Sequence, residues 1–461
     1  EHGYASEGES FSIADRSGEV WIMELIGRGG TGRKGAVWVA MRIPDGYVSG
    51  HSNQARITTF PRNDPDRCLY AQDVVELAKR IGVYKSSEDD PNDSKFSFSD
   101  VYDPMNFLGA RMGEARTWAV FSSIAQDQSF QQKYENYAMG TDLTNRMPLW
   151  IAPNAKLNLE DIISIMSNHY ENTAITFDSD VGAGQYQAPY RSRPLVWHNN
   201  DRTYHNERAV GTQQTAWNFI AQIRLNVPVQ ISSILWFAAD DSSTSPRYPV
   251  YGSSTSVSHA YAGRGPQDGV PCPLLDFDLT KAFWVQNMVS NLVYSRYEDA
   301  YPMLRDKIMD LHRDFQRQVH LLDDQIMALL QHNSTNTKQD ADEKKEQMVH
   351  LATQFSVKAG DKLHGEWLSF YGQLFARLRD FYVVTPDPSD TACQCKVSEG
   401  GFSDRWKEQI IKDTGKHYEQ IDKTTTVPDV NEKNLRSSAD TEEYSGDVFL
   451  TKSKLQLKAM H

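Results

Sequence analysis

Three strand-like runs follow one another closely near the start of the chain, and they limit the possible fold more than any other stretch. Residues 11–14 form a short run, residues 20–26 (VWIMELI) are almost wholly apolar, and residues 37–43 (VWVAMRI) form the third. A run that is apolar on both faces is typical of a strand buried on both sides of a sheet. A polar turn at residues 15–18 and a glycine-rich stretch at 27–35 separate the runs. This pattern predicts strands joined by hairpin loops.

A polar segment follows the third run. Residues 50–56 read GHSNQAR, directly after a strand that we expect to be buried. Loops at the exits of buried strands often carry functional residues, because a rigid scaffold holds them where they meet solvent. We therefore expect a site at this exit.

Composition excludes some classes of protein. The chain has 461 residues, of which 39% are hydrophobic, enough to form a sizeable core in one large unit or in two or three domains. The net charge of −13 argues against a nucleic-acid-binding protein, which would need a basic face. The acidic balance is compatible with an acidic compartment, although ordinary solubility explains it better. No apolar run is long enough to span a membrane.

From residue 280 the sequence becomes helical. Residues 281–294 form one predicted helix, and apolar residues then recur every three or four positions through 304–329 and again through 348–381. Two long amphipathic helices joined by a short polar loop should pack antiparallel, covering a sheet or forming an interface such as that of a homo-oligomer. The expected organisation is a core at 1–280, long helices at 281–385 and a polar extension at 386–461.

The cysteines and glycosylation motifs bear on the compartment. We expect Cys393 and Cys395 to be too close for an easy mutual bridge, which leaves open a bridge from one of them to Cys68 or Cys272. Asn92 and Asn333 begin Asn-X-Ser/Thr triplets in polar stretches. Together, the even cysteine count and the two triplets favour a secreted or lysosomal (or vacuolar) glycoprotein.

No cofactor or metal is expected. The acidic, glycine-rich residues 178–184 lack the length and final glutamate of a helix-loop-helix calcium site, so a simple turn is the better interpretation. The scattered histidines have no metal-ligand spacing. Arg111 and Arg116 stand before and at the start of a predicted helix over 115–124. They could hold a substrate carboxylate, but residue types alone favour ion pairs with nearby acids.

Four motifs resemble the dipeptidase A family of cysteine peptidases: GESFSIAD, EVWIMELIG, RIPDGYVSGHSNQARI and YDPMNFLGARMGEARTWAVF. The resemblance extends over about residues 8 to 380 and is strongest at 8–57. It implies an α+β fold, the four-layer αββα sandwich of N-terminal-nucleophile hydrolases, here followed by a long C-terminal helical hairpin. It also implies hydrolysis of small peptides.

The resemblance implies roles for five residues. Asn53 matches the asparagine that donates to the oxyanion, and Arg116 matches the arginine that orients the nucleophile. Arg111 is the second choice for that arginine and a candidate substrate-binding residue. His51 and Gln54 flank Asn53, so we expect them to line the substrate pocket.

The family's nucleophile is a cysteine upstream of the GESFSIAD strand, and we expect it to lie outside the 461 residues. Its thiol would attack the peptide carbon while its own α-amine carries the proton. Three explanations stay open: a precursor cut into a small chain with the cysteine and this large chain, a copy without peptidase activity, or numbering that starts partway along a longer polypeptide. We favour the first. The alternative function is that of a catalytically inactive relative serving as a structural or binding protein.

Overall fold

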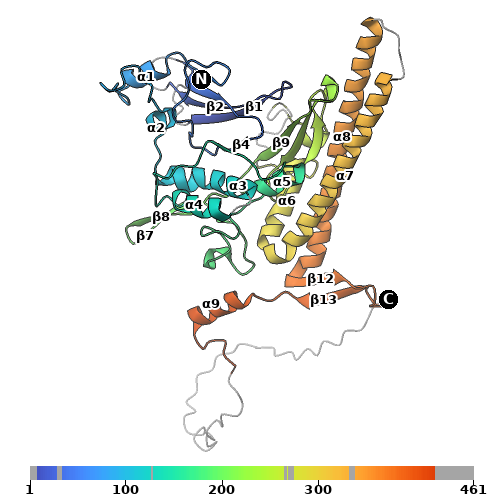
Figure 1. The fold of residues 1–461 in the computed structure, drawn as a ribbon. Coiled ribbons are helices and arrows are strands. Elements are labelled where there is room, and N and C mark those ends of the chain that lie inside the picture. Colours follow the sequence, from blue (N-terminus) through green and yellow to red (C-terminus); the bar gives the residue numbers. More distant parts are fainter. Residues whose placement is uncertain are drawn as a thin grey trace, which may run out of the picture. The chain divides into compact units, whose positions relative to one another are not determined.

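The computed structural model describes residues 8–28, 34–125, 128–263, 267, 275–331 and 338–420. The chain divides into two compact units, Glu1–Lys407 and Glu408–His461. All the elements below belong to the first unit, apart from the end of the last helix. Antiparallel sheets and long helices occupy different stretches of the chain (Figure 1), so the fold is α+β with long C-terminal helices.

The predicted strands near the start of the chain form one antiparallel sheet. Its order is β1 (Gly8–Ala14), β2 (Val20–Gly27), β3 (Ala36–Arg42) and β5 (Cys68–Tyr70). The three predicted strands are confirmed, although the first begins three residues earlier than expected. The strongly β-forming residues of β2 and β3 pair along their whole length, from Trp21 opposite Arg42 to Gly27 opposite Ala36.

The prediction that β2 is buried on both faces is wrong. Ile22 and Glu24 are buried, whereas Trp21, Met23 and Leu25 between them are partly exposed. Successive side chains of a strand point to opposite faces, and only one face of this sheet packs on a hydrophobic cluster. The other face is apolar in sequence but is incompletely covered within the described residues.

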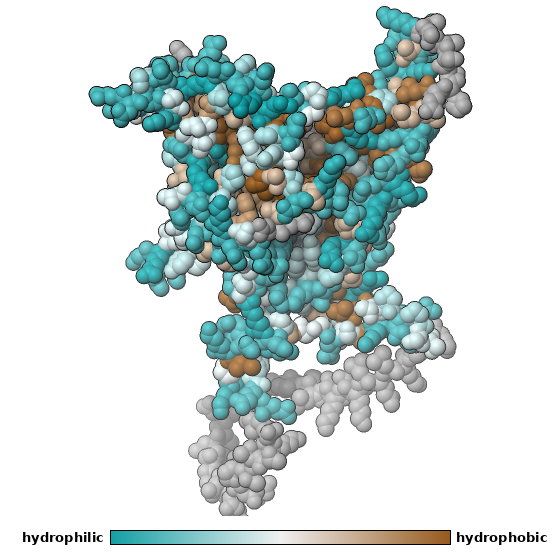
Figure 2. Space-filling view, in the orientation of Figure 1, coloured by the Kyte–Doolittle hydropathy of each residue, from teal (hydrophilic) through white to brown (hydrophobic). Residues whose placement is uncertain are grey.

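A second antiparallel sheet has the order β11 (Tyr248–Tyr251), β10 (Ser233–Ala239) and β9 (Trp217–Ile223). The strand predicted at 227–239 begins later, because a 3₁₀ turn, η3 (Val229–Ile231), precedes it. One face packs on the helices through Ile234 and Trp236. The other face exposes Trp217 and Phe219, whose rings stack 5.7 Å apart. Figure 2 shows apolar side chains gathered over this sheet and the adjoining part of α8.

The predicted long helices are confirmed. They are α6 (Ala282–Ser295), α7 (Tyr297–Gln331) and α8 (Lys338–Leu378), and α7 and α8 lie side by side (Figure 1). Their buried faces carry the residues that recur every three or four positions, as the sequence pattern requires. None of the helices in the described part of the chain is both long and apolar enough to cross a membrane.

The other elements connect or cover the two sheets and the long helices. They are α1 (Val74–Arg80), α2 (Phe98–Tyr102), the π-helix η1 (Gly109–Glu114), α3 (Ala115–Ala125), α4 (Gln128–Ala138), α5 (Leu159–Met166), β4 (Val48–Ser49), β6 (Trp150–Ile151), β7 (Val196–Asn199), β8 (Arg202–His205), η2 (Val181–Ala183), η4 (His259–Tyr261), η6 (Arg379–Phe381), β12 (Tyr382–Pro386), β13 (Cys395–Glu399) and α9 (Asp404–Thr414).

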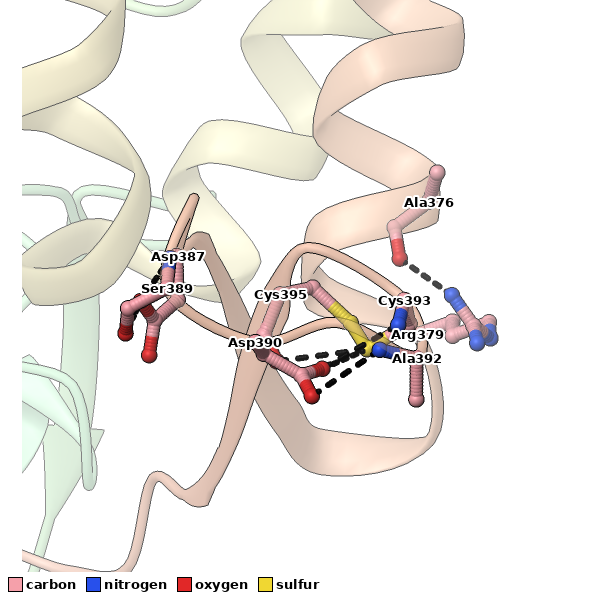
Figure 3. The surroundings of a disulfide bond; sticks show 8 residues. All are labelled: Ala376, Arg379, Asp387, Ser389, Asp390, Ala392, Cys393 and Cys395. Atoms are coloured by element: carbon pink, nitrogen blue, oxygen red, sulfur yellow. Dashed lines mark hydrogen bonds between the residues drawn. A yellow bond between two sulfur atoms is a disulfide. The ribbon is translucent and has the colours of Figure 1, made fainter.

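The cysteine prediction is corrected by the structure. Cys393 and Cys395 bridge each other at the end of the β12–β13 hairpin (Figure 3), and Cys68 is a free, buried thiol. Cys272 lies outside the described residues. Gln394 has a φ of +52°, a left-handed conformation that reverses the chain between the two cysteines. Their Cα atoms therefore lie 5.2 Å apart, within the usual range for a disulfide.

The packing of α8 gives a direct test. Trp367 is fully buried in the hydrophobic cluster formed by the second sheet, α6, α7 and α8, whereas Phe375 on the same helix is 56% exposed. We expect Trp367→Ala to lower the free energy of unfolding by about 3–5 kcal/mol, because it removes a large buried side chain and leaves a cavity. Phe375→Ala should cost less than about 0.5 kcal/mol. Urea unfolding of both variants measures this, and similar losses would contradict the observed packing.

Candidate active site

The polar loop after β4 forms one wall of a cavity of about 570 Å³, a size typical of small-ligand sites. The cavity also reaches β1, β2, the segment before η1 and the start of α3. Its lining residues are Gly8, Glu9, Ser10, Glu24, Leu25, Ile26, His51, Ser52, Asn53, Gln54, Ala55, Asp103, Arg116 and Arg208.

Glu24 fastens the loop to the sheet. Its side chain points to the buried face of β2, where one carboxylate oxygen accepts from the backbone N–H of Arg56 at 2.7 Å and the other from that of Ile57 at 2.9 Å. Burial raises the pKa of Glu24 to about 7, although these two donors and the positive charge of Arg56 act in the opposite direction. The charged form of Glu24 is therefore costly, and the loop backbone offsets part of that cost.

Arg56 fastens the other side of the loop. Its guanidinium forms a buried ion pair with Glu114 of η1, at 2.8 Å between Nε and Oε1. It also donates to the carbonyl oxygens of Gly50 at 2.7 Å and Pro148 at 2.8 Å. A buried guanidinium needs both a counter-charge and acceptors for its remaining N–H groups, and this site supplies both.

Asp103 holds the middle of the loop. Its Oδ2 atom accepts from the backbone N–H of Ala55 and from the side-chain amide of Gln54, each at 2.8 Å. Gln54 is buried and lines the cavity, but its amide nitrogen is already engaged by Asp103. Its placement beside the cavity agrees with the expectation, and its role with substrate stays a prediction.

Asn53 and Arg116 meet at the cavity wall. The guanidinium of Arg116, in the first turn of α3, donates to Asn53 Oδ1 at 2.9 Å. It also donates to the carbonyl oxygens of Ser52 at 3.2 Å and Met112 at 2.7 Å. Asn53 has a φ of +55°, a left-handed conformation that asparagine tolerates better than most residues. Because its oxygen accepts from Arg116, the Nδ2 group of Asn53 is left as a donor, with no acceptor among the described residues.

Gly113 in the π-helix η1 permits this contact. A Cβ atom built there would lie 2.9 Å from the carbonyl oxygen of Ser52 and 3.1 Å from Cβ of Gln54. Any side chain at this position would therefore displace the loop from η1. π-Helical turns occur often at functional sites, and this one directly precedes α3, which carries Arg116 in its first turn.

His51 joins the loop to the edge strand. Its Nε2 atom lies 3.1 Å from the hydroxyl of Ser12 in β1. Burial and then the charge of Arg56 lower the pKa of His51 below its usual value, so the ring is neutral at neutral pH. His51 lines the cavity, as expected from the sequence.

Arg111 is not among the lining residues. Its guanidinium pairs with Glu207 and lies over the ring of Phe107. The structure thus brings together Asn53, Arg116, His51 and Gln54 and places Arg111 away from them. No group of three histidine, cysteine, aspartate or glutamate side chains in the described ranges could hold a metal ion.

The lining residues that were not predicted from the sequence include three charged ones, Glu24, Asp103 and Arg208. Glu24 had a detectable signal, because it is the one charged residue in an otherwise apolar run. Asp103 lies in the fourth family motif, but nothing in the sequence indicated that it contacts the loop, and Arg208 had no signal for the site, since only the tertiary fold brings both residues to the cavity. Asn92, the first glycosylation candidate, is exposed, whereas Asn333 lies outside the described residues.

The sequence matches the profile of Peptidase family C69 over residues 1–309. The chain belongs to this family. This confirms the resemblance found in the motifs around the loop and α3. The family relationship makes the cavity that holds Asn53 and Arg116 the first candidate for the active site.

The curated relatives of this C69 chain are bacterial dipeptidases of low identity. Dipeptidase A of Lactobacillus helveticus is 23% identical over 65% of this chain and 53% of its own length. A probable dipeptidase of Latilactobacillus sakei is 21% identical over 64% and 51%. Probable dipeptidase B of Lactococcus lactis is 22% identical over 71% and 60%. The chain thus spans about half the length of the relatives it matches.

The titration of Glu24 gives a second test. Between about pH 4.5 and pH 7 the folded chain keeps a proton on Glu24 that the unfolded chain has released, so the Glu24 contribution to stability falls as pH rises through this range. The change should total about 3 kcal/mol. Glu24→Gln removes this pH dependence, and the loss of one hydrogen-bond acceptor costs the variant the same amount at every pH. We therefore expect the free energy of unfolding of the variant to rise by about 3 kcal/mol relative to that of the wild type as the pH increases from about 4.5 to 7.

Urea unfolding of both proteins at several pH values measures this difference. A difference between wild type and Glu24→Gln that does not change with pH would show that Glu24 keeps an ordinary pKa in the folded chain.

Proposed function

We propose that this chain is the large chain of a cysteine-type dipeptidase that hydrolyses small peptides by the N-terminal-nucleophile mechanism. Membership of family C69 and the names of its relatives support peptide hydrolysis. The single observation that carries the assignment of the site is the contact between Arg116 and Asn53 Oδ1 at the cavity wall.

The proposed fold is the four-layer sandwich of N-terminal-nucleophile hydrolases. Two features support it. The chain has two separate antiparallel sheets, each packed on one face. Each sheet also has a second face that is apolar and partly exposed within the described residues, around Phe11 and Ile13 in the first sheet and Trp217 and Phe219 in the second. Faces of this kind are suited to pack on each other or on further strands.

In the proposed mechanism Asn53 stabilises the oxyanion. When a thiol attacks the peptide carbon, negative charge develops on the former carbonyl oxygen. The Nδ2 group of Asn53 is oriented to donate to that oxygen, because Arg116 fixes the amide by binding its Oδ1 atom. The nearby guanidinium also polarises the amide and strengthens it as a donor.

The nucleophile would come from an upstream segment outside the 461 residues or from a separate processed chain. Its α-amine would accept the thiol proton and pass it to the leaving amine, since an α-amine has a pKa near neutrality. Water would then hydrolyse the thioester. The proposed location is a secreted or lysosomal compartment, which the exposed Asn92 and the Cys393–Cys395 disulfide support.

The proposal is tested on protein isolated from its natural source, with any partner chain retained. We expect hydrolysis of unmodified dipeptides that a thiol-alkylating reagent abolishes. Mass spectrometry should find a polypeptide that begins with cysteine, together with a glycan on Asn92. A single 52.4 kDa chain that lacks a reactive N-terminal cysteine and has no dipeptide hydrolysis would instead favour an inactive binding protein.

The oxyanion role of Asn53 has its own test. We expect Asn53→Ala to lower kcat by about 10²- to 10³-fold, the usual loss when one oxyanion donor is removed. Asn172→Ala is the matched control, because Asn172 also has a positive φ, +60°, but does not line the cavity. It separates the cost of backbone strain from the chemistry. Equal activity in the two variants, measured by steady-state dipeptide hydrolysis, would remove Asn53 from the mechanism.

A further inference from the structure

Two guanidinium groups line the cavity without a carboxylate partner. Arg116 donates to Asn53 Oδ1 and to the carbonyl oxygens of Ser52 and Met112, all neutral acceptors. Arg208 makes no side-chain hydrogen bond or ion pair with any described residue, and its buried Nε atom has no acceptor. Most arginines in the interior of this chain, such as Arg56 with Glu114 and Arg111 with Glu207, have an acidic partner.

The two guanidinium groups are close enough to repel each other. Burial and then the charge of Arg208 lower the pKa of Arg116 to about 10. Burial and then the charge of Arg193 lower the pKa of Arg208. Two like charges in a partly desolvated cavity have an unfavourable electrostatic energy. An anion bound between or beside the two guanidinium groups makes that energy more favourable.

The carboxylates that line the cavity do not neutralise Arg116 or Arg208. Both oxygens of Glu24 accept from backbone N–H groups of the loop. Asp103 Oδ2 accepts from Ala55 and Gln54. The third lining carboxylate, Glu9 of β1, is exposed. None of the three forms an ion pair with Arg116 or Arg208 within the described residues, so the positive charge at this wall has no direct counter-charge there.

We propose that Arg208 binds the free α-carboxylate of the peptide substrate. This inference rests on the proposed function and extends it to substrate selection. A guanidinium matches a carboxylate in shape and can donate two parallel N–H groups to it. With Asn53 at the scissile carbonyl, an arginine in the same cavity of about 570 Å³ favours substrates whose C-terminus lies close to the cleaved bond. Short peptides with a free C-terminus meet that condition, and amidated peptides do not.

Arg208→Gln and Arg208→Lys test this in the naturally assembled protein. The kinetic substrates are a dipeptide and its C-terminal amide. We expect wild type to prefer the free acid, and Arg208→Gln to raise KM for it about 10- to 100-fold, as expected for loss of hydrogen bonds to a charged group. Hydrolysis of the amide should change little, and Arg208→Lys should recover part of the loss. Arg193→Gln is the matched control, because it removes a nearby positive charge from an exposed residue that does not line the cavity.

A binding measurement keeps this inference separate from the peptidase proposal. Calorimetry uses a dipeptide whose peptide bond is replaced by a reduced, uncleavable isostere, with inorganic phosphate as a second probe. Binding that requires both Arg208 and the free carboxylate supports Arg208 as the carboxylate-binding residue. If such binding is found without hydrolysis, only the peptidase proposal fails. The inference is overturned if wild type does not bind the isostere, if Arg208→Gln binds it equally, or if phosphate binds as tightly as the isostere.

Discussion

The candidate site depends on one buried carboxylate that accepts hydrogen bonds from two consecutive backbone N–H groups. Glu24 in β2 fixes residues 56 and 57 to the sheet, and Arg56 then reaches the opposite wall at Glu114. The polar loop between them is held from both sides before any ligand binds. A donor fixed in this way needs no reorganisation when charge develops on a substrate. The cost is the burial of Glu24, Arg56 and Glu114, which is tolerated because each of these three groups has a hydrogen-bond or ion-pair partner.

The sequence was sufficient to predict the elements with a strong apolar pattern. Strands β2 and β3 lie where short apolar runs predict strands, and helices α7 and α8 lie where apolar residues recur every three or four positions. These patterns did not reveal how much of each face is covered, and β2 was wrongly expected to be buried on both sides. The disulfide was also missed. The expectation that two cysteines separated by one residue cannot bridge easily ignores the left-handed turn at Gln394.

The site was predictable where motifs carry it and not where the tertiary fold assembles it. The loop motif led to Asn53, His51 and Gln54, and all three line the cavity. Residue types alone did not separate Arg111 from Arg116, and only the family resemblance ranked Arg116 first. The structure separates them, since a Glu207 partner holds Arg111 elsewhere while the loop contacts Arg116. Arg208 lies more than 150 residues from the loop, in a polar stretch that gave no local signal.

The left-handed backbone at Asn53 restricts which residues this position can accept. A φ of +55° is readily adopted by glycine, asparagine and aspartate. Glycine has no side chain to offer, and the carboxylate of aspartate would bind Arg116 as an ion pair while presenting no N–H group to the cavity. Asparagine alone satisfies the backbone, accepts from the guanidinium and still donates. Under the proposed mechanism, replacing Asn53 therefore requires a different conformation of the loop that carries it.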